Sequence, residues 1–387
     1  MIYLDNSATT ALCERAKLKM IEAMDCFGNP SSLHSVGYEA SVLLDGARGA
    51  VAASLGIRRG SGYEIVFTGS GTEANNMALT GVSEAKTRLT SRRIITTDSE
   101  HPSILEPLSR LEMMGFEIIK ISTRDGVLDM ETLDAALDKG ALIISLMLVN
   151  NETGARYDVE KAFASARRKC PDIVTHCDAT QGYMKMPVSP MKLGADLLTV
   201  SAHKIHGPKG VGVLCIATDI VKTKKIVPVI RGGGQEKAFR SGTENMIGIA
   251  GFWGAVEQMM PVCAKNAQYV SELRAYAESL LSGIDGVKLN VPKGARAPHI
   301  ISVTLPDIKS ETMVHFLSSK GIAVSAGSAC SSHNTHVSES LTGFGLDRHS
   351  AMCTIRISLC ADNTREHMDA LADALGEGVA TLVRIRK

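Results

Sequence analysis

The stretch "LIISLMLV", residues 142–149, decides the fold. Seven of its eight residues are apolar and do not alternate with polar ones, which is typical of a strand buried on both faces of a sheet. The run is far too short to span a bilayer as a helix. The polar residues "NNETG" follow directly. The stretch therefore predicts a central strand of a largely parallel sheet, with hydrogen-bonding groups placed where the strand ends.

Short strand-like runs recur on both sides of this stretch, and helical patterns separate several of them. The further candidate strands are residues 64–69, 93–98, 117–122, 173–178, 197–202 and 210–217. Helical patterns include residues 71–89 and 102–115. Strands that alternate with helices indicate βαβ units. We therefore expect an α/β fold whose large domain has a mostly parallel seven-stranded sheet covered by helices on both faces.

The pattern changes after about residue 252, where a long helical stretch begins. Pro261 should divide this stretch, because proline removes a helical hydrogen bond and clashes with the preceding turn. Beyond it, strand and helix patterns mix as in an α+β unit. A chain of 387 residues also exceeds what one hydrophobic core normally organises. We expect an N-terminal segment 1–14 that packs with the small domain, a large domain over 15–260 and a smaller α+β domain over 261–387.

Composition and charge narrow the class of protein. Hydrophobic residues make up 44% of the chain and charged residues 21%, as in an ordinary soluble globular protein. The formal net charge of +1 gives no reason to expect direct nucleic-acid binding. The first ten residues, "MIYLDNSATT", contain neither the cationic nor the apolar region of a signal peptide. We expect a cytoplasmic protein with no membrane partner.

The nine cysteines form neither a CxxC pair nor a His/Cys cluster at zinc spacing. A disulfide framework is not expected in a reducing compartment. Cys177 and Cys215 lie in strand-like runs, so we interpret them as small apolar residues of the core. Cys330 differs, because its neighbours in "SAGSACSSHN", residues 325–334, are small and polar.

Polar residues collect where five of the predicted strands end. "EIVFTG" is followed by "SGTEANN", "RIITTD" by "SEHPS", "LMLV" by "NNETG", "IVTHC" by "DATQG", and "LLTVS" by "AHKIHGPKG". In open α/β sheets, ligands bind beyond the carboxyl ends of the strands. The clustering of these loops, more than any single motif, predicts a functional site at this edge.

Three of these loops carry groups with a possible chemical role. Gly71 and Thr72 stand where a strand gives way to a helix, so backbone N–H groups there could bind a phosphate. The same residues also fit an ordinary capped turn. Asp178 ends an apolar strand, where a carboxylate needs a cation such as a protonated pyridine nitrogen, or several hydrogen-bond donors. A simple turn-capping aspartate is the alternative.

Lys204 comes directly after a strand, between His203 and Ile205 and three residues beyond Ser201. A lysine in a partly desolvated site can react with a carbonyl to form a Schiff base, although an isolated lysine is usually a surface residue. A phosphate cradle, an acid for a pyridinium and a lysine for an aldehyde together match the needs of pyridoxal 5′-phosphate.

The chain resembles the cysteine desulfurases of the class V aminotransferase superfamily over essentially its whole length. The matching stretches are "YLDNSATT", "GNPSSLHSVG", "GSGTEANN", "EHPS", "NNETG", "DATQG", "SAHKIHGPKG", "GGGQEKAFRSGTEN", "GSACSS" and "IRISL". The resemblance implies the type I fold of pyridoxal-phosphate-dependent transferases, pyridoxal 5′-phosphate as cofactor, L-cysteine as substrate and a homodimer.

The resemblance also implies a role for individual residues. Lys204 would bind the cofactor covalently and move protons, His101 would stack on the pyridine ring and assist proton transfer, and Asp178 would pair with the ring nitrogen. The phosphate end of the cofactor would be held by Gly71, Thr72, Ser201 and His203, together with Thr243 of a partner subunit. Gln181 and Asn151 would contact the phenolic oxygen and the substrate carboxylate. Arg356 would bind the substrate α-carboxylate.

Cys330 would act as the nucleophile of the reaction. As a thiolate it would take the sulfur of L-cysteine as a persulfide and leave L-alanine. The polar residues that follow, "HNTHVSES", have no apolar periodicity and suit a mobile tether. The 26-residue separation of Cys330 from Arg356 resembles the longer-loop branch, which supplies iron–sulfur cluster assembly and tRNA thiolation through a scaffold or other acceptor protein.

Some features leave alternatives open. His333 and His336 beside Cys330 could ligate a metal, and Cys353 and Cys360 could have a redox role. An aminotransferase or a selenocysteine lyase on the same scaffold is an alternative enzyme, and a non-catalytic sulfur-relay protein is an alternative of another class. The presence of Lys204 together with the other site residues argues against the last. The sulfur acceptor is not identified by the sequence.

Overall fold

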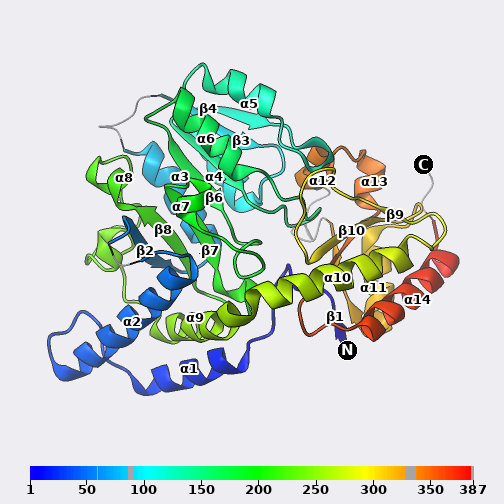
Figure 1. The fold of residues 1–387 in the computed structure, drawn as a ribbon, viewed down its shortest axis with the longest axis horizontal. Coiled ribbons are helices and arrows are strands. Elements are labelled where there is room, and N and C mark those ends of the chain that lie inside the picture. Colours follow the sequence, from blue (N-terminus) through cyan, green and yellow to red (C-terminus); the bar gives the residue numbers. More distant parts are fainter. Residues whose placement is uncertain (59, 86–90, 328–336, 385–387) are drawn as a thin grey trace.

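The computed structural model describes residues 1–58, 60–85, 91–327 and 337–384. Its largest sheet has seven strands in the order β2-β8-β7-β6-β5-β3-β4 (Figure 1). Their bounds are β2 Tyr63–Thr68, β3 Arg93–Thr97, β4 Glu117–Ile121, β5 Ile143–Met147, β6 Val174–Asp178, β7 Leu197–Ser201 and β8 Gly212–Ala217. β8 runs antiparallel to both of its neighbours, β2 and β7, and the other neighbouring pairs in this sheet are parallel. The predicted mostly parallel seven-stranded sheet is therefore confirmed.

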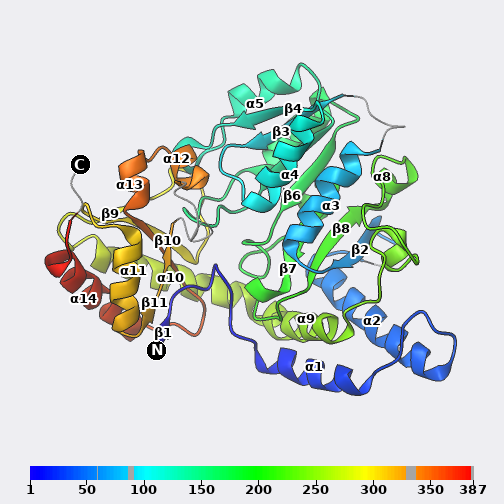
Figure 2. The same cartoon turned by 180° about the vertical axis from the view of Figure 1, so that it is seen from behind.

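Helices cover both faces of this sheet. On one face, α3 (Gly71–Ser83), α4 (Pro102–Met113) and α8 (Thr218–Lys222) share a hydrophobic cluster with the strands (Figure 2). The other face carries α2 (Ser35–Ser54), α5 (Met130–Leu137), α6 (Val159–Lys169), α7 (Pro190–Leu193) and α9 (Met246–Met259).

Neighbouring strand residues belong to opposite clusters, as Ile143 and Ile144 do. Because both faces are buried, the strand sequences are continuously apolar.

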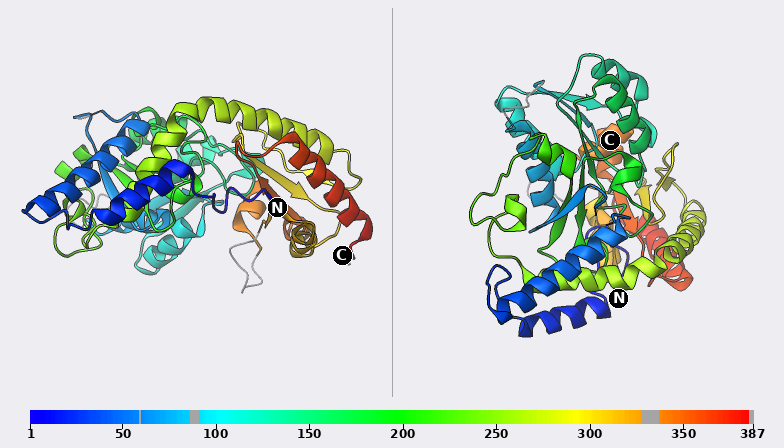
Figure 3. Two further views of the ribbon diagram at one scale, coloured as in Figure 1. Left: turned by 90° about the horizontal axis from the view of Figure 1, so that it is seen from below. Right: turned by 60° about the vertical axis from the view of Figure 1, so that its left-hand side comes forward.

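The chain passes from the large sheet to its C-terminal part through two consecutive helices. α9 ends at Met259, a single 3₁₀ turn spans Met260–Val262, and α10 runs over Cys263–Leu281. The predicted division of this helical stretch at Pro261 is confirmed. Figure 3 shows α10 bridging the two parts of the molecule.

The C-terminal part contains a four-stranded antiparallel sheet in the order β12-β13-β10-β9. The strands of this sheet are β9 Lys288–Leu289, β10 Ile300–Thr304, β12 Ser325–Ala326 and β13 Thr354–Ser358. The helices of the C-terminal part that follow α10 are α11 Ser310–Ser319, α12 Glu339–Phe344, α13 Arg348–Met352 and α14 Arg365–Thr381. The N-terminal strand β1 (Ile2–Tyr3) pairs with β11 (Ile322–Ala323), and Leu4 lies in the hydrophobic cluster of this part. The domain limits proposed from the sequence stay a prediction.

Helix α1 (Glu14–Asp25) and α2 form an N-terminal arm for which the sequence patterns gave no assignment. α1 lies beside α9, where Gly254 leaves room for the α1 backbone: a Cβ there would lie 2.4 Å from the carbonyl oxygen of Arg15. Among the residues described, no helix combines the length and the apolar character that a membrane span requires.

The loop 231–245 is anchored to the edge of the large sheet by a buried ion pair. Both Glu236 carboxylate oxygens accept from the Arg48 guanidinium at 2.8 Å, and the Phe67 N–H of β2 donates to the same carboxylate at 2.8 Å. Glu236, Lys237 and Ala238 all have positive φ, a conformation that costs L-residues roughly 1–2 kcal/mol each. The ion pair therefore stabilises a strained turn.

We predict that Glu236→Ala lowers the free energy of unfolding by on the order of 3 kcal/mol, because it leaves the Arg48 charge without its partner. Urea denaturation followed by circular dichroism measures the change. The matched control is Lys293→Ala, which removes the exposed ion pair with Asp125 (2.8 Å) and should cost less than about 1 kcal/mol. Equal losses in the two variants would contradict the stabilising role of the buried pair.

Candidate active site

A cavity of about 940 Å³ opens where the parallel strands end. This volume falls within the range of small-molecule and cofactor sites. The loops after β2, β3, β5, β6 and β7 all reach it, as the sequence predicted, and the N-terminal segment and the C-terminal part complete it. Its polar lining includes Ser7, Ser70, Gly71, Thr72, Asn75, Glu100, His101, Asn151, Glu152, Asp178, Gln181, Ser201, His203, Lys204, Ser325, Ser338 and Arg356.

The N-terminus of α3 forms one wall of the cavity. Ser70 caps the helix, accepting the N–H of Glu73 at 3.0 Å. Gly71 keeps the wall close to neighbouring loops: a Cβ there would lie 3.4 Å from Thr180 Oγ1 and 3.5 Å from Ser201 Cβ. Ser201 Oγ is buried and has no hydrogen-bond partner among the residues that the structure describes. The positive end of α3 and this unpartnered hydroxyl fit a phosphate group.

Asp178 and His101 are joined by a chain of hydrogen bonds. Asn75 Nδ2 donates to Asp178 Oδ2 and to Ser103 Oγ, both at 2.8 Å, and Ser103 Oγ lies 2.9 Å from His101 Nδ1. The backbone N–H of Ser103 also donates to His101 Nδ1 at 3.1 Å, so this nitrogen is an acceptor and the neutral ring carries its proton on Nε2. Burial lowers the pKa of His101, which favours that neutral form.

Lys204 follows β7 in a short 3₁₀ turn (Ala202–Lys204). Its Nζ donates to the backbone oxygens of Ser7 and Ala8 at 2.5 and 2.8 Å. The neighbouring His203 has a pKa lowered to about 4, first by burial and then by the charge of Lys204. The N-terminal segment therefore holds the lysine that the sequence predicted to be reactive.

Arg356 brings the C-terminal part to the cavity. Its guanidinium donates to Asp5 Oδ1 at 2.8 Å, to the Asn151 backbone oxygen at 2.9 Å and to Ser325 Oγ at 3.1 Å. Within the described parts of the chain, its Nε is buried without a hydrogen-bond partner, and so is Asn151 Oδ1. Unpartnered buried donors and acceptors beside an open cavity fit a polar ligand. Arg356 is therefore oriented and still has a donor available.

Two carboxyl groups that the sequence did not single out line the cavity, the buried Glu100 and the half-buried Glu152. Burial raises the pKa of Glu100 to about 8 and that of Glu152 to about 7. Glu152 accepts from the hydroxyl of Ser338, the N-cap of α12, at 2.7 and 2.8 Å, and a Cβ at Gly327 would lie 3.4 Å from its Oε2. Glu152 thus contacts residues on both sides of segment 328–336.

The remaining predicted residues divide into three groups. Thr72, Asn151, Gln181 and His203 line the cavity. Thr243 is exposed and is not among the lining residues. Cys330, His333 and His336 lie outside the described residues. The structure gives the positions of the described residues, while the chemical roles of all the predicted residues stay predictions.

Three of the other cysteines have thiols that ionise less readily than usual. Cys177 and Cys215 are fully buried in core strands, as expected, and burial raises the pKa of both thiols. Burial also raises the pKa of Cys353 to about 11. Within the described part of the chain, no three His, Cys, Asp or Glu side chains are grouped so that they could hold a metal ion.

Asn75, Ser103 and the carbonyl groups of Ser7 and Ala8 were missed by the sequence interpretation. Asn75 lies within the quoted "GTEANN" stretch, one helical turn from the cap, so its position near the strand ends was a usable signal. The two carbonyl groups carry no side-chain signal at all.

We predict that the free energy of unfolding of the wild type decreases as the pH rises, compared with that of Glu100→Gln. The folded protein keeps a proton on Glu100 up to about pH 8, whereas the unfolded chain loses it near the ordinary pKa, so this contribution declines as the pH rises between the two values. Between pH 6 and 8 the relative loss should be on the order of 2 kcal/mol, measured by urea denaturation. The exposed Glu112→Gln serves as control; parallel curves for wild type and Glu100→Gln would show that Glu100 is ionised throughout.

Comparisons with known proteins identify the family of this chain. The family model described as "Aminotransferase class-V" matches residues 2–371. The chain is 38% identical over 381 residues to the cysteine desulfurase IscS of Dictyoglomus turgidum. This match covers 97% of this chain and 93% of the relative. A solved NifS-like protein superposes with a TM-score of 0.90 at 36% identity, covering 98% of this chain and 100% of the other. SspA, solved in complex with cysteine, superposes with a TM-score of 0.80 at 28% identity over 94% of this chain and 100% of the other. The chain therefore belongs to the class V aminotransferase family and, within it, to the cysteine desulfurases.

Proposed function

We propose that the cavity binds pyridoxal 5′-phosphate and L-cysteine, and that the enzyme converts L-cysteine to L-alanine while Cys330 receives the sulfur as a persulfide. The observation that carries this proposal is that Lys204, His101, Asp178 and Arg356, from four distant segments, line one cavity. An amine, an imidazole, a carboxylate and a guanidinium are the groups this reaction needs, and the N-terminus of α3 lines the same cavity.

The lining residues suit the proposed cofactor. When bound, pyridoxal 5′-phosphate supplies an aldehyde for covalent attachment to an amine and a ring that draws electrons from the substrate's Cα. The N-terminus of α3 with Ser201 and His203 would hold the phosphate, and Asp178 would hold the ring nitrogen in its protonated form. Asn75 keeps the Asp178 carboxylate in place by its 2.8 Å hydrogen bond.

The substrate would be oriented by Arg356. A guanidinium binds a carboxylate through parallel N–H donors, and the contacts with Asp5 and the Asn151 carbonyl already fix its position, so little side-chain entropy is lost on binding. The Lys204 amine and the His101 imidazole would move protons at the substrate's Cα and neighbouring atoms. Lowering of the His101 pKa by burial keeps its ring neutral, and the proton on Nε2 is the one it could donate.

The sulfur transfer step would use Cys330. Its thiolate attacks the substrate sulfur, a sulfur–sulfur bond forms, and the bond between the substrate's Cβ and sulfur breaks. The electron pair of the broken bond stays with carbon, which is protonated to become the methyl group of L-alanine. The persulfide then passes to an acceptor protein for iron–sulfur cluster assembly or tRNA thiolation.

A second copy of the chain would complete the site. Seven exposed apolar residues form what we call the arm patch, on and between α1 and α2: Leu18, Ile21, Met24, Phe27, Leu33, Tyr38 and Val42. Large exposed apolar patches are typical of protein interfaces. Thr243 is exposed away from its own cavity, which suits a residue that reaches the cofactor of a partner subunit.

The activity is tested with L-cysteine and a thiol reductant. The wild type should release alanine and sulfide in equal amounts and show the absorbance of a lysine-bound cofactor. Lys204→Ala should lose that absorbance and at least about 10³-fold in rate. Cys330→Ala should keep the absorbance and lose sulfide release. Normal sulfide release by Cys330→Ala would overturn the role of Cys330, and amino transfer to a keto acid would instead identify an aminotransferase.

The homodimer is tested by charging the arm patch. Ile21→Asp with Met24→Asp should convert a particle of twice the chain mass into one of a single chain, measured by light scattering after gel filtration, because a buried unpaired carboxylate is costly. Met113→Asp changes a methionine on α4 that is even more exposed, and it should leave the mass unchanged. A wild type that is monomeric and fully active would contradict the proposal.

A further inference from the structure

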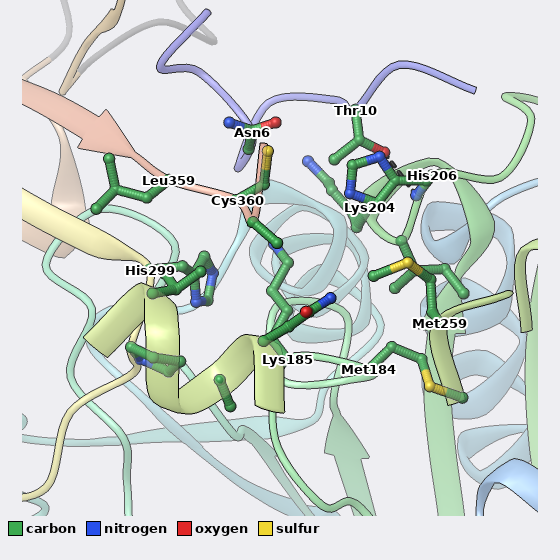
Figure 4. Close-up of a pocket in the computed structure, with 16 residues that line it drawn as sticks. Asn6, Thr10, Met184, Lys185, Lys204, His206, Met259, His299, Leu359 and Cys360 are labelled. Carbon is green, nitrogen blue, oxygen red and sulfur yellow. Dashed lines mark hydrogen bonds between the residues drawn. The ribbon is translucent and has the colours of Figure 1, made fainter. Parts of the chain in front are cut away.

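Lys204 also lines a second, smaller pocket of about 40 Å³ (Figure 4). Residues from the N-terminal segment, from the α9–α10 region and from the end of β13 surround it. Lys185, His299 and Cys360 project into it, and none of them has a part in the proposed reaction. The small pocket adjoins the large cavity at Lys204, which lines both.

Gln181 connects the two spaces. It lines the large cavity, while its amide oxygen lies 3.4 Å from Lys185 Nζ and 3.5 Å from His299 Nε2. Its Nε2 donates to the Ser7 carbonyl oxygen at 2.9 Å, the same oxygen that accepts from Lys204. A carbonyl oxygen only accepts, so the NH₂ group must face Ser7 and the amide oxygen must face Lys185 and His299.

The protonation states of the two donors suit this arrangement. Burial, followed by the charge of Lys185, lowers the pKa of His299 far below its usual value, so the ring is neutral and carries one N–H. With that proton on Nε2, the other nitrogen is bare, and His299 Nδ1 indeed has no partner in the described structure. Burial and then Lys204 lower the pKa of Lys185 to about 7, but an amine donates hydrogen bonds in either form.

We infer that Lys185 and His299 are positioning residues, which hold the Gln181 amide so that its second N–H points to an acceptor oxygen of the ligand in the large cavity. An amide NH₂ has two donors, and the Ser7 carbonyl uses one. The site would therefore favour a ligand with an ionised oxygen at this position over one that lacks it. With the proposed cofactor, on which this inference rests, that atom is the phenolic oxygen.

The first measurement uses the cofactor-free protein and so does not depend on the proposed function. With ¹⁵N-labelled glutamine, the side-chain amide of Gln181, assigned through Gln181→Asn, should exchange its protons slowly. Lys185→Met and His299→Phe should each speed this exchange about tenfold, the effect of losing one hydrogen bond. His299→Gln, which keeps a donor at a similar reach, should restore slow exchange. Unchanged exchange in both Lys185→Met and His299→Phe would overturn the inference.

The second measurement tests the ligand preference. Calorimetry should show that Lys185→Met binds pyridoxal 5′-phosphate about tenfold more weakly than wild type, while its affinity for 3-deoxypyridoxal 5′-phosphate, which lacks the phenolic oxygen, is unchanged. The exposed Lys192→Met is the matched control and should bind both ligands as wild type does. Equal weakening for both ligands would reduce Lys185 to a structural role and overturn the inference. If wild type binds neither ligand, the proposed function fails, and the exchange measurement alone decides on the positioning role.

Discussion

The structure of the site depends on one buried cation, Arg356, whose charge must be compensated by neighbouring groups. A guanidinium taken out of water needs partners for its N–H groups, and Arg356 finds them in Asp5, in the Asn151 carbonyl and in Ser325. These groups come from the N-terminus, from the loop after the central strand and from the C-terminal part. Satisfying one charge therefore joins three distant segments around a single cavity.

The N-terminal segment also joins distant parts of the chain, on the other side of the cavity. Its backbone carbonyls at Ser7 and Ala8 accept from Lys204, and its strand β1 adds to the C-terminal part through β11. The same few residues thus connect the amine at the end of β7 with the guanidinium on β13. A small displacement of this segment would alter the positions of both charged groups together, although they lie more than one hundred and fifty residues apart.

The sequence predicted the features that local patterns encode. Apolar runs located all seven strands of the large sheet, Pro261 located the break between α9 and α10, and the polar residues after five strands located the cavity. It did not reveal Glu100 and Glu152 as carboxyl groups with raised pKa values, because a glutamate in a polar loop has the same local pattern whether it is exposed or enclosed. Lys185 was missed for the same reason. Its position beside Gln181 depends on how distant segments fold around it, and a lysine is ordinarily a surface residue.

The turn formed by Glu236, Lys237 and Ala238 has a consequence for how two chains would meet. Its left-handed backbone is held by the contacts of Glu236 with Arg48 and with the edge strand, within a single chain. The loop that carries Thr243 is therefore ordered before any second chain arrives. Its conformational entropy is lost during folding, so an encounter between two chains would join preformed surfaces and proceed without a slow rearrangement of this loop.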